Sequence, residues 1–479
     1  MKLTFLVPPC YDNDQPAERS AGCTRIVYPM INIYELTAAA TLREAGYDVA
    51  YRDFVFNKEP AEMFDRFLET DNSDAYLIWT VNLSLESDLE AITHIRKYHP
   101  STPVIMMGPG PTYYLHRALY DSNTYLVRGE PELTLLELMA ALAKGDKPVG
   151  VKGVTFIAAD GKRVSNPPRP LNPDLDALPF PARDLLQGRE YHNPKLKTGP
   201  YTTAFTSRNC PFRCIYCVPS SLTFAREIEY RKEHHRKPTI GFRSIESVER
   251  EIDQLAAEGY KAIGFMDDNF IWNEERTAEI CRIMRKHGLV WGCQARVDAI
   301  TEPIAKLLGE SGCRYVDLGI ESFDPGILEY IKKGITPEDI YRSVELLKKY
   351  KVPVKLNVLI GSSPLETRET IRHTLREATR LDVDQVMFNI VSPFPGTEYY
   401  EICMENGWIK GGDYRPTDVQ RESILDLPYI SADEMEKLLY SNNLRYFLRP
   451  RYVLKQLGRF HSVKELKAAA KALKMKLFH

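Results

Sequence analysis

The sequence has no apolar run of membrane-spanning length, almost no net charge and no paired cysteine framework. None of its apolar runs approaches the roughly 20 residues that a bilayer crossing takes, and the short apolar stretch at residues 1–10 indicates a buried first strand. The formal net charge of −2 gives no electrostatic reason to expect nucleic acid as a partner. Nine cysteines are an odd number on a long chain, unlike a secreted disulfide scaffold. We therefore expect a cytoplasmic protein with reduced thiols available to metals.

Only one segment carries a marked excess of charge. Residues 441–479 hold ten Lys or Arg and a single acid, Glu465, interspersed with Leu and Phe. A solvated helix packed on the rest of the protein is the simpler interpretation. The alternative is peripheral contact with a membrane surface or an anionic substrate, which would also favour a lipid-like substrate.

The first 148 residues alternate short apolar runs with helical patterns. Predicted strands cover residues 3–9, 47–54, 74–81, 103–108 and 124–129, and predicted helices cover 31–46, 61–69, 86–99, 111–121 and 131–145. Near-continuous apolar strands alternating with helices predict an α/β domain with a doubly wound, Rossmann-like parallel sheet. Ligands of such sheets bind outside the carboxyl ends of the strands.

The rest of the chain is predicted to form three further parts. Residues 149–200 hold a hairpin and a proline-rich linker, and residues 401–479 form a helical, basic C-terminal region. Between them, residues 201–400 alternate helices with six strands, at 201–207, 262–267, 290–296, 315–321, 354–361 and 385–391. Six such units fit a partial (β/α)6 TIM-type barrel, in which chemistry gathers at the carboxyl ends of the strands.

Three cysteines follow the first predicted barrel strand. Cys210, Cys214 and Cys217 have the spacing C-x3-C-x2-C. Three thiolates can hold three irons of a 4Fe-4S cluster and leave the fourth iron without a protein ligand. An open metal position lets a small molecule become the last ligand. The alternatives are a zinc site completed by a remote Cys or His, and three unrelated thiols.

With Tyr216 before the last cysteine, this motif resembles the signature of the radical S-adenosylmethionine (SAM) superfamily. The whole chain resembles the cobalamin-binding subgroup of that superfamily. The resemblance implies a 4Fe-4S cluster whose open iron takes the amino and carboxylate groups of SAM. It also implies reductive cleavage of SAM to a 5′-deoxyadenosyl radical, with the electron supplied by a protein such as flavodoxin or ferredoxin.

The resemblance further assigns SAM contacts to the ends of the barrel strands. Asp267 and Asp268 would bind the amino group, although either aspartate could instead cap the helix that follows. Arg296 would pair with a carboxylate in a dry site, or with an ordinary surface partner. The other expected SAM contacts, for each of which core packing is the alternative, are Tyr216, Glu321, Ser322, Asn357, Gly361 and Ser392.

The N-terminal sheet is expected to bind cobalamin. It has no Asp-x-His-x-x-Gly motif, which in other cobalamin proteins supplies a histidine below the cobalt, but cobalamin-dependent radical SAM enzymes commonly lack that motif. Small residues in three turns would let the backbone approach the cofactor. The alternative is an empty, flavodoxin-like accessory domain. The expected contacts are Asn82, Ser84, Gly108, Gly110, Gly129 and Glu130.

Four other cysteines have structural interpretations. Cys281, Cys293 and Cys313 are predicted to be buried small residues. Cys10 faces the expected cofactor, and a structural role is favoured over a reactive one.

The activity that the resemblance implies is methylation of an unactivated carbon in a small-molecule or lipid-like substrate. Oxidative cyclisation or ring rearrangement, as in anaerobic porphyrin-ring cyclases, is an alternative outcome of the same radical. A non-catalytic cobalamin or iron–sulfur sensor is an alternative of another class. No residue separates methylation from cyclisation, because both begin with abstraction of a hydrogen atom.

Overall fold

The computed structural model describes residues 1–11, 15–20, 24–25, 29–186, 188, 190–218, 220–450 and 452–453. The chain divides into two compact units. The first comprises Met1–Phe212, Cys217–Gln294 and Lys306–Tyr315, and the second comprises Arg213–Tyr216, Ala295–Ala305 and Val316–His479. Most of the basic tail lies outside the described residues, so its contact with a membrane stays a prediction. The four-part division at residues 148, 200 and 400 also stays a prediction.

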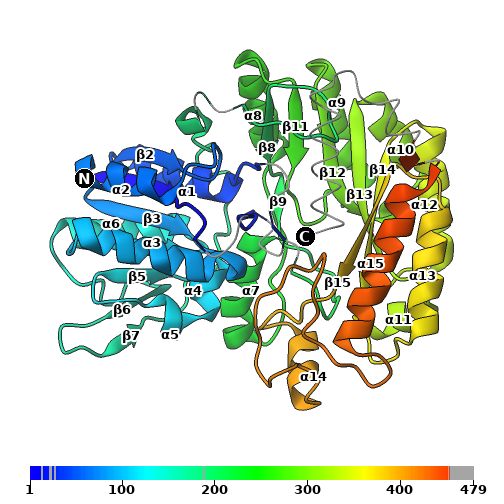
Figure 1. Ribbon diagram of the computed structural model, residues 1–479. Helices are drawn as coiled ribbons and strands as arrows, with labels where there is room; N and C mark the ends of the chain where they lie inside the picture. The colour runs from blue at the N-terminus through cyan, green and yellow to red at the C-terminus, as the bar shows by residue number, and fades with distance from the viewer. Residues whose placement is uncertain are drawn as a thin grey trace. The chain divides into compact units, whose positions relative to one another are not determined.

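The N-terminal strands of the first unit form one sheet in the order β2-β1-β3-β4-β5-β6-β7 (Figure 1). The parallel strands are β1 (Lys2–Val7), β2 (Asp48–Asp53), β3 (Ala75–Trp79), β4 (Val104–Met107) and β5 (Thr124–Val127). All five match the predicted strands. The predicted hairpin, β6 (Val154–Ile157) and β7 (Arg163–Ser165), extends the same sheet with two antiparallel strands.

Helices cover both faces of this sheet, which explains its apolar strands. Along β3, Leu77 and Trp79 enter one core, whereas Tyr76 and Ile78 enter the other. The first core is shared with α1 (Ile33–Glu44) and α6 (Glu132–Ala143), and the second with α2 (Ala61–Thr70), α3 (Leu85–Tyr98) and α5 (Leu115–Ala118). The helix expected over 111–121 is divided at Tyr114 (φ −88°, ψ 48°) into α4 (Pro109–Tyr113) and α5.

The second sheet has the strand order β15-β14-β13-β12-β11-β8. Its strands are β8 (Tyr201–Ala204), β11 (Ala262–Phe265), β12 (Val290–Arg296), β13 (Cys313–Glu321), β14 (Val354–Ile360) and β15 (Gln385–Ile390). The six predicted strands are therefore all present. The strand pairs β8–β11, β11–β12, β13–β14 and β14–β15 are parallel. Over the described residues no pairing joins β8 to β15, so the sheet is open, as a partial barrel requires.

The helices that connect these strands begin and end at local signals. The Ser244 hydroxyl caps α8 by accepting a hydrogen bond from the Ser247 amide at 3.0 Å. Gly259 follows that helix at φ +90°, a conformation that favours glycine. The connecting helices are α7 (Ser221–His234), α8 (Ile245–Ala257), α9 (Glu274–Lys286), α10 (Glu302–Glu310), α11 (Pro325–Tyr330), α12 (Pro337–Lys349) and α13 (Arg368–Arg380).

Beyond β15 the described residues form two helices, α14 (Glu398–Glu405) and α15 (Ala432–Leu448). Residues 406–431 between them form no helix or strand, and the positive φ of Gly407, Gly411 and Gly412 bends the chain where this segment begins. Within the described ranges, none of the helices combines the length and the apolar character that a membrane crossing needs.

Candidate functional site

The three cysteines of the motif lie in an irregular loop between β9 (Ser207–Arg208) and α7. Cys210 and Cys217 are half-buried, Cys214 is buried, and all three are free of disulfides. Across the described part of the chain, no three His, Cys, Asp or Glu side chains are already gathered as a metal site. The donor set nevertheless suits iron or zinc, because three cysteines occur within one short loop, and both metals bind cysteine sulfur. The metal role of these cysteines therefore stays a proposal.

The two aspartates after β11 have different surroundings. Asp267 is fully buried and accepts hydrogen bonds from the Thr206 amide, the Thr206 hydroxyl (2.7 Å) and the Ser207 hydroxyl (2.6 Å). It thereby fixes the segment that leads into the cysteine loop. Asp268 is half-buried and accepts a hydrogen bond from the Thr223 hydroxyl of α7, and burial raises its pKa to about 6. Of the two residues, Asp267 is the more deeply buried.

Neither aspartate caps the helix that follows. The Asn273 side chain caps α9 by accepting a hydrogen bond from the Arg276 amide at 2.8 Å. The alternative that Asp267 or Asp268 caps α9 is therefore wrong, because Asn273 immediately precedes the helix and already accepts from one of its first amides.

A buried network of charges connects the end of β5 with the cysteine loop, within the first unit. Arg208 pairs with Glu130 at 3.0 Å and with Glu132 at 2.6 Å, and Arg226 of α7 pairs with Glu130 at 2.9 Å. Burial alone would raise the pKa of Glu130, but Arg226 and Arg208 outweigh it and lower the pKa. The other Glu130 oxygen accepts from the Asn172 amide at 2.6 Å. Glu130, expected to contact cobalamin, thus has both carboxylate oxygens engaged by protein.

The turn after β3 presents polar atoms that no described residue satisfies. Asn82 is only 3% exposed, and neither its amide nitrogen nor its amide oxygen has a hydrogen-bond partner; the Thr80 hydroxyl also lacks one. Unsatisfied buried polar atoms are costly, so a polar ligand at this edge would satisfy them. Ser84 is different: its hydroxyl binds the Asp88 carboxylate at 2.8 Å and accepts from the Val81 amide.

The glycines expected at this edge are needed by the protein itself. A Cβ on Gly108 would lie 2.8 Å from the Thr80 carbonyl oxygen, and one on Gly110 would lie 2.8 Å from the Thr80 methyl carbon. Gly108 also has φ +99°. Gly129 also has a positive φ, +74°, but a Cβ added there would meet only the Glu229 side chain, at an ordinary contact distance of 4.0 Å. The turns after β3 and β4 therefore pack closely through glycine.

A second set of expected residues lies in the second unit, around the end of β13. Glu321 is buried, has φ +61° and accepts a hydrogen bond from Lys333 Nζ at 2.8 Å. Arg296 forms a bidentate pair with Asp298, both contacts at 2.9 Å, and also donates to the Lys333 carbonyl at 2.8 Å. Nothing in the sequence indicated Lys333, whose partner Glu321 is twelve positions away.

The loop after β14 is built around a carboxylate that the sequence analysis missed. Glu366 accepts hydrogen bonds from the amides of Gly361 and Ser362, both at 2.7 Å, and burial raises its pKa to about 7. Gly361 has φ +79°, and an added Cβ would lie 2.8 Å from Met435 Sδ. Asn357 is half-buried in the middle of β14.

Three other expected SAM contacts lie elsewhere in the second unit. Ser392, after β15, is 2% exposed and its hydroxyl has no partner among the described residues. Ser322 is engaged, since its hydroxyl contacts the Thr374 hydroxyl at 3.0 Å and accepts from the Asp324 amide. Tyr216 is buried within the cysteine loop. Of these three expected SAM contacts, Ser392 is the one whose hydroxyl has no hydrogen-bond partner among the described residues.

Three further cysteines are buried as predicted, whereas the structural role expected of Cys10 stays a prediction. Cys281, Cys293 and Cys313 are completely buried, on α9, β12 and β13 respectively. Burial raises the pKa of the Cys281 thiol to about 12, which makes it a poor nucleophile. Cys10 is half-buried after β1.

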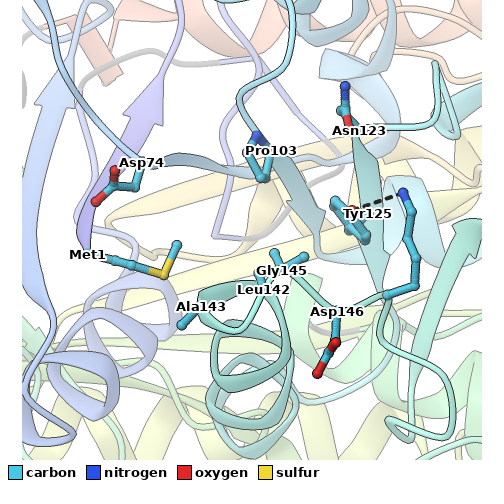
Figure 2. A pocket seen from close by; sticks show the side chains of 10 residues that line it. Met1, Asp74, Pro103, Asn123, Tyr125, Leu142, Ala143, Gly145 and Asp146 are labelled. Atoms are coloured by element: carbon cyan, nitrogen blue, oxygen red, sulfur yellow. Dashed lines mark hydrogen bonds between the residues drawn. The ribbon is translucent and has the colours of Figure 1, made fainter.

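A pocket lies at the opposite edge of the N-terminal sheet, where its strands begin (Figure 2). It has a volume of about 440 Å³, and its lining includes Met1, Asp74, Tyr125 and Lys147. Lys147 Nζ donates to the Tyr125 hydroxyl at 3.3 Å. None of the expected cofactor residues lines this pocket, since those residues follow the strands' carboxyl ends.

The sequence matches one protein-family model and is similar to enzymes of other organisms. The model of the Radical SAM superfamily matches residues 205–405. An uncharacterised methyltransferase of Pyrococcus horikoshii is 34% identical over 363 residues, covering 75% of each chain. An anaerobic magnesium-protoporphyrin IX monomethyl ester cyclase of Rubrivivax gelatinosus is 25% identical and covers 76% of this chain and 64% of its own.

Two solved structures share the fold. The radical SAM methyltransferase TsrM of Kitasatospora setae, with cobalamin and a [4Fe-4S] cluster bound, has a TM-score of 0.64 at 21% identity, covering 85% of this chain and 75% of its own. The cobalamin-dependent radical SAM enzyme OxsB, with aqua-cobalamin and SAM bound, has a TM-score of 0.72 at 15% identity, covering 100% and 72%. At these identities the comparison establishes the fold.

Proposed function

This chain belongs to the radical SAM superfamily, and from that membership we propose that it is a cobalamin-dependent radical SAM methyltransferase. Its substrate in this proposal is a small-molecule or lipid-like compound with an unactivated carbon. The observation that carries the proposal is the spacing of Cys210, Cys214 and Cys217 within the one short loop that directly follows β9. The resemblance in fold to OxsB over the whole chain supports the cobalamin part.

In this proposal Cys210, Cys214 and Cys217 hold a 4Fe-4S cluster. When bound, the cluster, SAM and cobalamin together supply the electron, the radical and the methyl group. Asp268 is suited to hold the cationic amino group of SAM, because it carries a carboxylate and is only partly buried, whereas Asp267 is fully buried. Asp267 orients the approach to the loop instead, since Thr206 and Ser207 occupy its carboxylate.

The same reasoning assigns cobalamin to the carboxyl edge of the N-terminal sheet. Asn82 would hydrogen-bond the cofactor, because its buried side-chain amide has no partner among the described residues. Gly108 and Gly110 bring the turn after β4 against Thr80 and thereby shape this edge. Glu130 is no longer among the proposed contacts, because Arg208 and Arg226 neutralise it.

Oxidative cyclisation is the second candidate. It is favoured by the similarity to the magnesium-protoporphyrin IX monomethyl ester cyclase, although the chain spans only 64% of that enzyme's length. In both cases a reductant such as flavodoxin or ferredoxin supplies the electron.

The first experiment is a measurement of iron, cobalt and zinc in protein purified without oxygen and then supplied with iron, sulfide and cobalamin. We expect about four irons and about one cobalt per chain, as one bound cobalamin provides. The variant Cys217→Ala should lose the iron, whereas Cys281→Ala, which alters a completely buried core thiol, should retain it. Zinc in place of iron would contradict the cluster, and iron without cobalt would remove the support for methylation.

The second experiment follows an isotope-labelled methyl group of SAM with candidate substrates. Label in the product would establish methylation. A modified product that carries no label would support cyclisation or rearrangement instead. A fully loaded, reduced protein that leaves SAM intact would favour a sensor.

A further inference from the structure

An ion pair is buried at the end of β13, in the second unit. Lys333 and Glu321 are 7% and 8% exposed, and Lys333 Nζ lies 2.8 Å from Glu321 Oε1. Burying two charges is costly, so such a pair is weak evidence of a role in stability. The preceding residue, Lys332, forms a comparable pair with Glu398 at the surface, where both side chains are nearly half exposed.

The backbone around this pair is arranged to hold it. A Cβ on Gly319 would lie 2.7 Å from Glu321 Oε1 and 3.0 Å from Lys333 Nζ, so only glycine leaves room for both charged groups. Glu321 itself has φ +61°, a conformation that costs a non-glycine residue about 1 kcal/mol or more. Arg296 donates to the Lys333 carbonyl at 2.8 Å. The position of the Lys333 ammonium is therefore well defined.

The same segment is bonded to the middle of the cysteine loop. Ile215 directly follows Cys214, and Ile331 lies two residues before Lys333. The Ile215 amide donates a hydrogen bond to the Ile331 carbonyl at 3.2 Å. The Tyr399 amide donates to the Ile215 carbonyl at 3.0 Å and fixes the other side of the loop. Burial would lower the pKa of Lys333, but Glu321 and then Cys214 outweigh it and raise that pKa. The buried ion pair therefore lies on the segment that is hydrogen-bonded to the residue following Cys214.

We propose that Lys333 and Glu321 tune the reduction potential of the metal cluster through Cys214. Lys333 is then a positioning residue whose positive charge stabilises the reduced, more negative cluster, and Glu321 offsets that charge. The inference rests on the proposed function, because it takes Cys214 as a cluster ligand. It differs from the expected contact of Glu321 with SAM, since the effect on potential is present before SAM binds.

The test is a reductive titration of the reconstituted protein without SAM, in which the reduced cluster is followed by electron paramagnetic resonance. Lys333→Met should lower the midpoint potential, and Glu321→Gln should raise it. Each substitution should change the equilibrium constant for one-electron reduction of the cluster about tenfold. That change corresponds to a shift of about 59 mV in the midpoint potential. The double variant should return close to the wild-type potential, because the charge of the pair is zero in both proteins. Lys332→Met is the matched control and should leave the potential unchanged.

Opposite shifts in the single variants, compensated in the double variant, are the outcome that a merely structural role would not produce. Equal potentials in all variants would overturn the inference, as would shifts of both single variants in the same direction or loss of iron from both. A wild-type protein with no cluster signal would instead overturn the proposed function itself.

Discussion

At the scale of single residues, the most unusual side chain is a buried acid in the N-terminal sheet region. Glu35 of α1 is completely buried, and one of its carboxylate oxygens has no hydrogen-bond partner among the described residues. Burial raises its pKa to about 8 from an ordinary value of 4.5, despite the nearby charge of Arg19. The folded protein therefore favours the neutral acid.

This buried acid predicts a specific dependence of stability on pH. Because the folded pKa is raised, the contribution of Glu35 is fully present below about pH 4.5 and is lost as pH rises toward about 8. The loss approaches 1.4 kcal/mol per pH unit in that window, or roughly 1–2 °C in Tm for a chain of this length. Tm measured from pH 5 to pH 9 should fall less steeply in Glu35→Gln than in the wild type. Glu44→Gln, at the exposed end of the same helix, should keep the wild-type slope.

At the scale of elements, the turn after β4 depends on close approach to the turn after β3. An alanine at Gly108 would place its Cβ 2.8 Å from the Thr80 carbonyl oxygen, at φ +99°. Gly145, at the end of α6, has a similar φ of +77° but nothing within 4 Å of an added Cβ. The two glycines thus separate the cost of backbone conformation from the cost of a steric clash.

We therefore expect Gly108→Ala to destabilise the protein more than Gly145→Ala. Both variants incur about 1–2 kcal/mol for positive φ, and Gly108→Ala adds about 1–3 kcal/mol for overpacking. Denaturant unfolding of the cofactor-free proteins measures the difference. Equal destabilisation in the two variants would show that the turns can separate, and the shape assigned to this edge would then be wrong.

At the scale of the whole chain, long-range ion pairs connect distant segments of the first unit. Arg208, next to the cysteine loop, pairs with Glu132, which is 76 positions earlier, and both side chains are 2% exposed. Removing one partner of such a pair leaves a buried charge without compensation. Removing both partners leaves none.

This network predicts a non-additive result. Arg208→Met should lower the free energy of unfolding by about 3–5 kcal/mol, and Arg208→Met with Glu132→Gln should recover most of the loss. Arg43→Met removes a surface pair with Asp184, whose side chains are 42% and 52% exposed, and should cost less than about 1 kcal/mol. Denaturant midpoints of the single and double variants provide the measurement. Additive losses in the double variant would mean that the two side chains act independently.

The sequence predicted the elements well because their signals are local. Apolar runs with turn residues at their ends identified each strand of the second sheet, and Ser244 with Gly259 bracketed α8 as expected. Electrostatic partners were not predictable in the same way. Nothing near Glu130 indicates that Arg208 and Arg226 occupy its carboxylate, and nothing near Lys333 indicates Glu321. Such partners are set by the folded chain rather than by spacing.

The hydrogen bonds of Ile215 determine when, during synthesis of the chain, the cysteine loop can reach its final structure. One of its anchors is Ile331 and the other is Tyr399, and both are synthesised long after the cysteines. At roughly 5–20 residues per second, translation from Ile215 to Tyr399 takes roughly 10–40 s. Throughout that interval the nascent loop exists without its second anchor. In the proposed function, a cluster that requires the completed loop would therefore be inserted only after most of the chain has been synthesised.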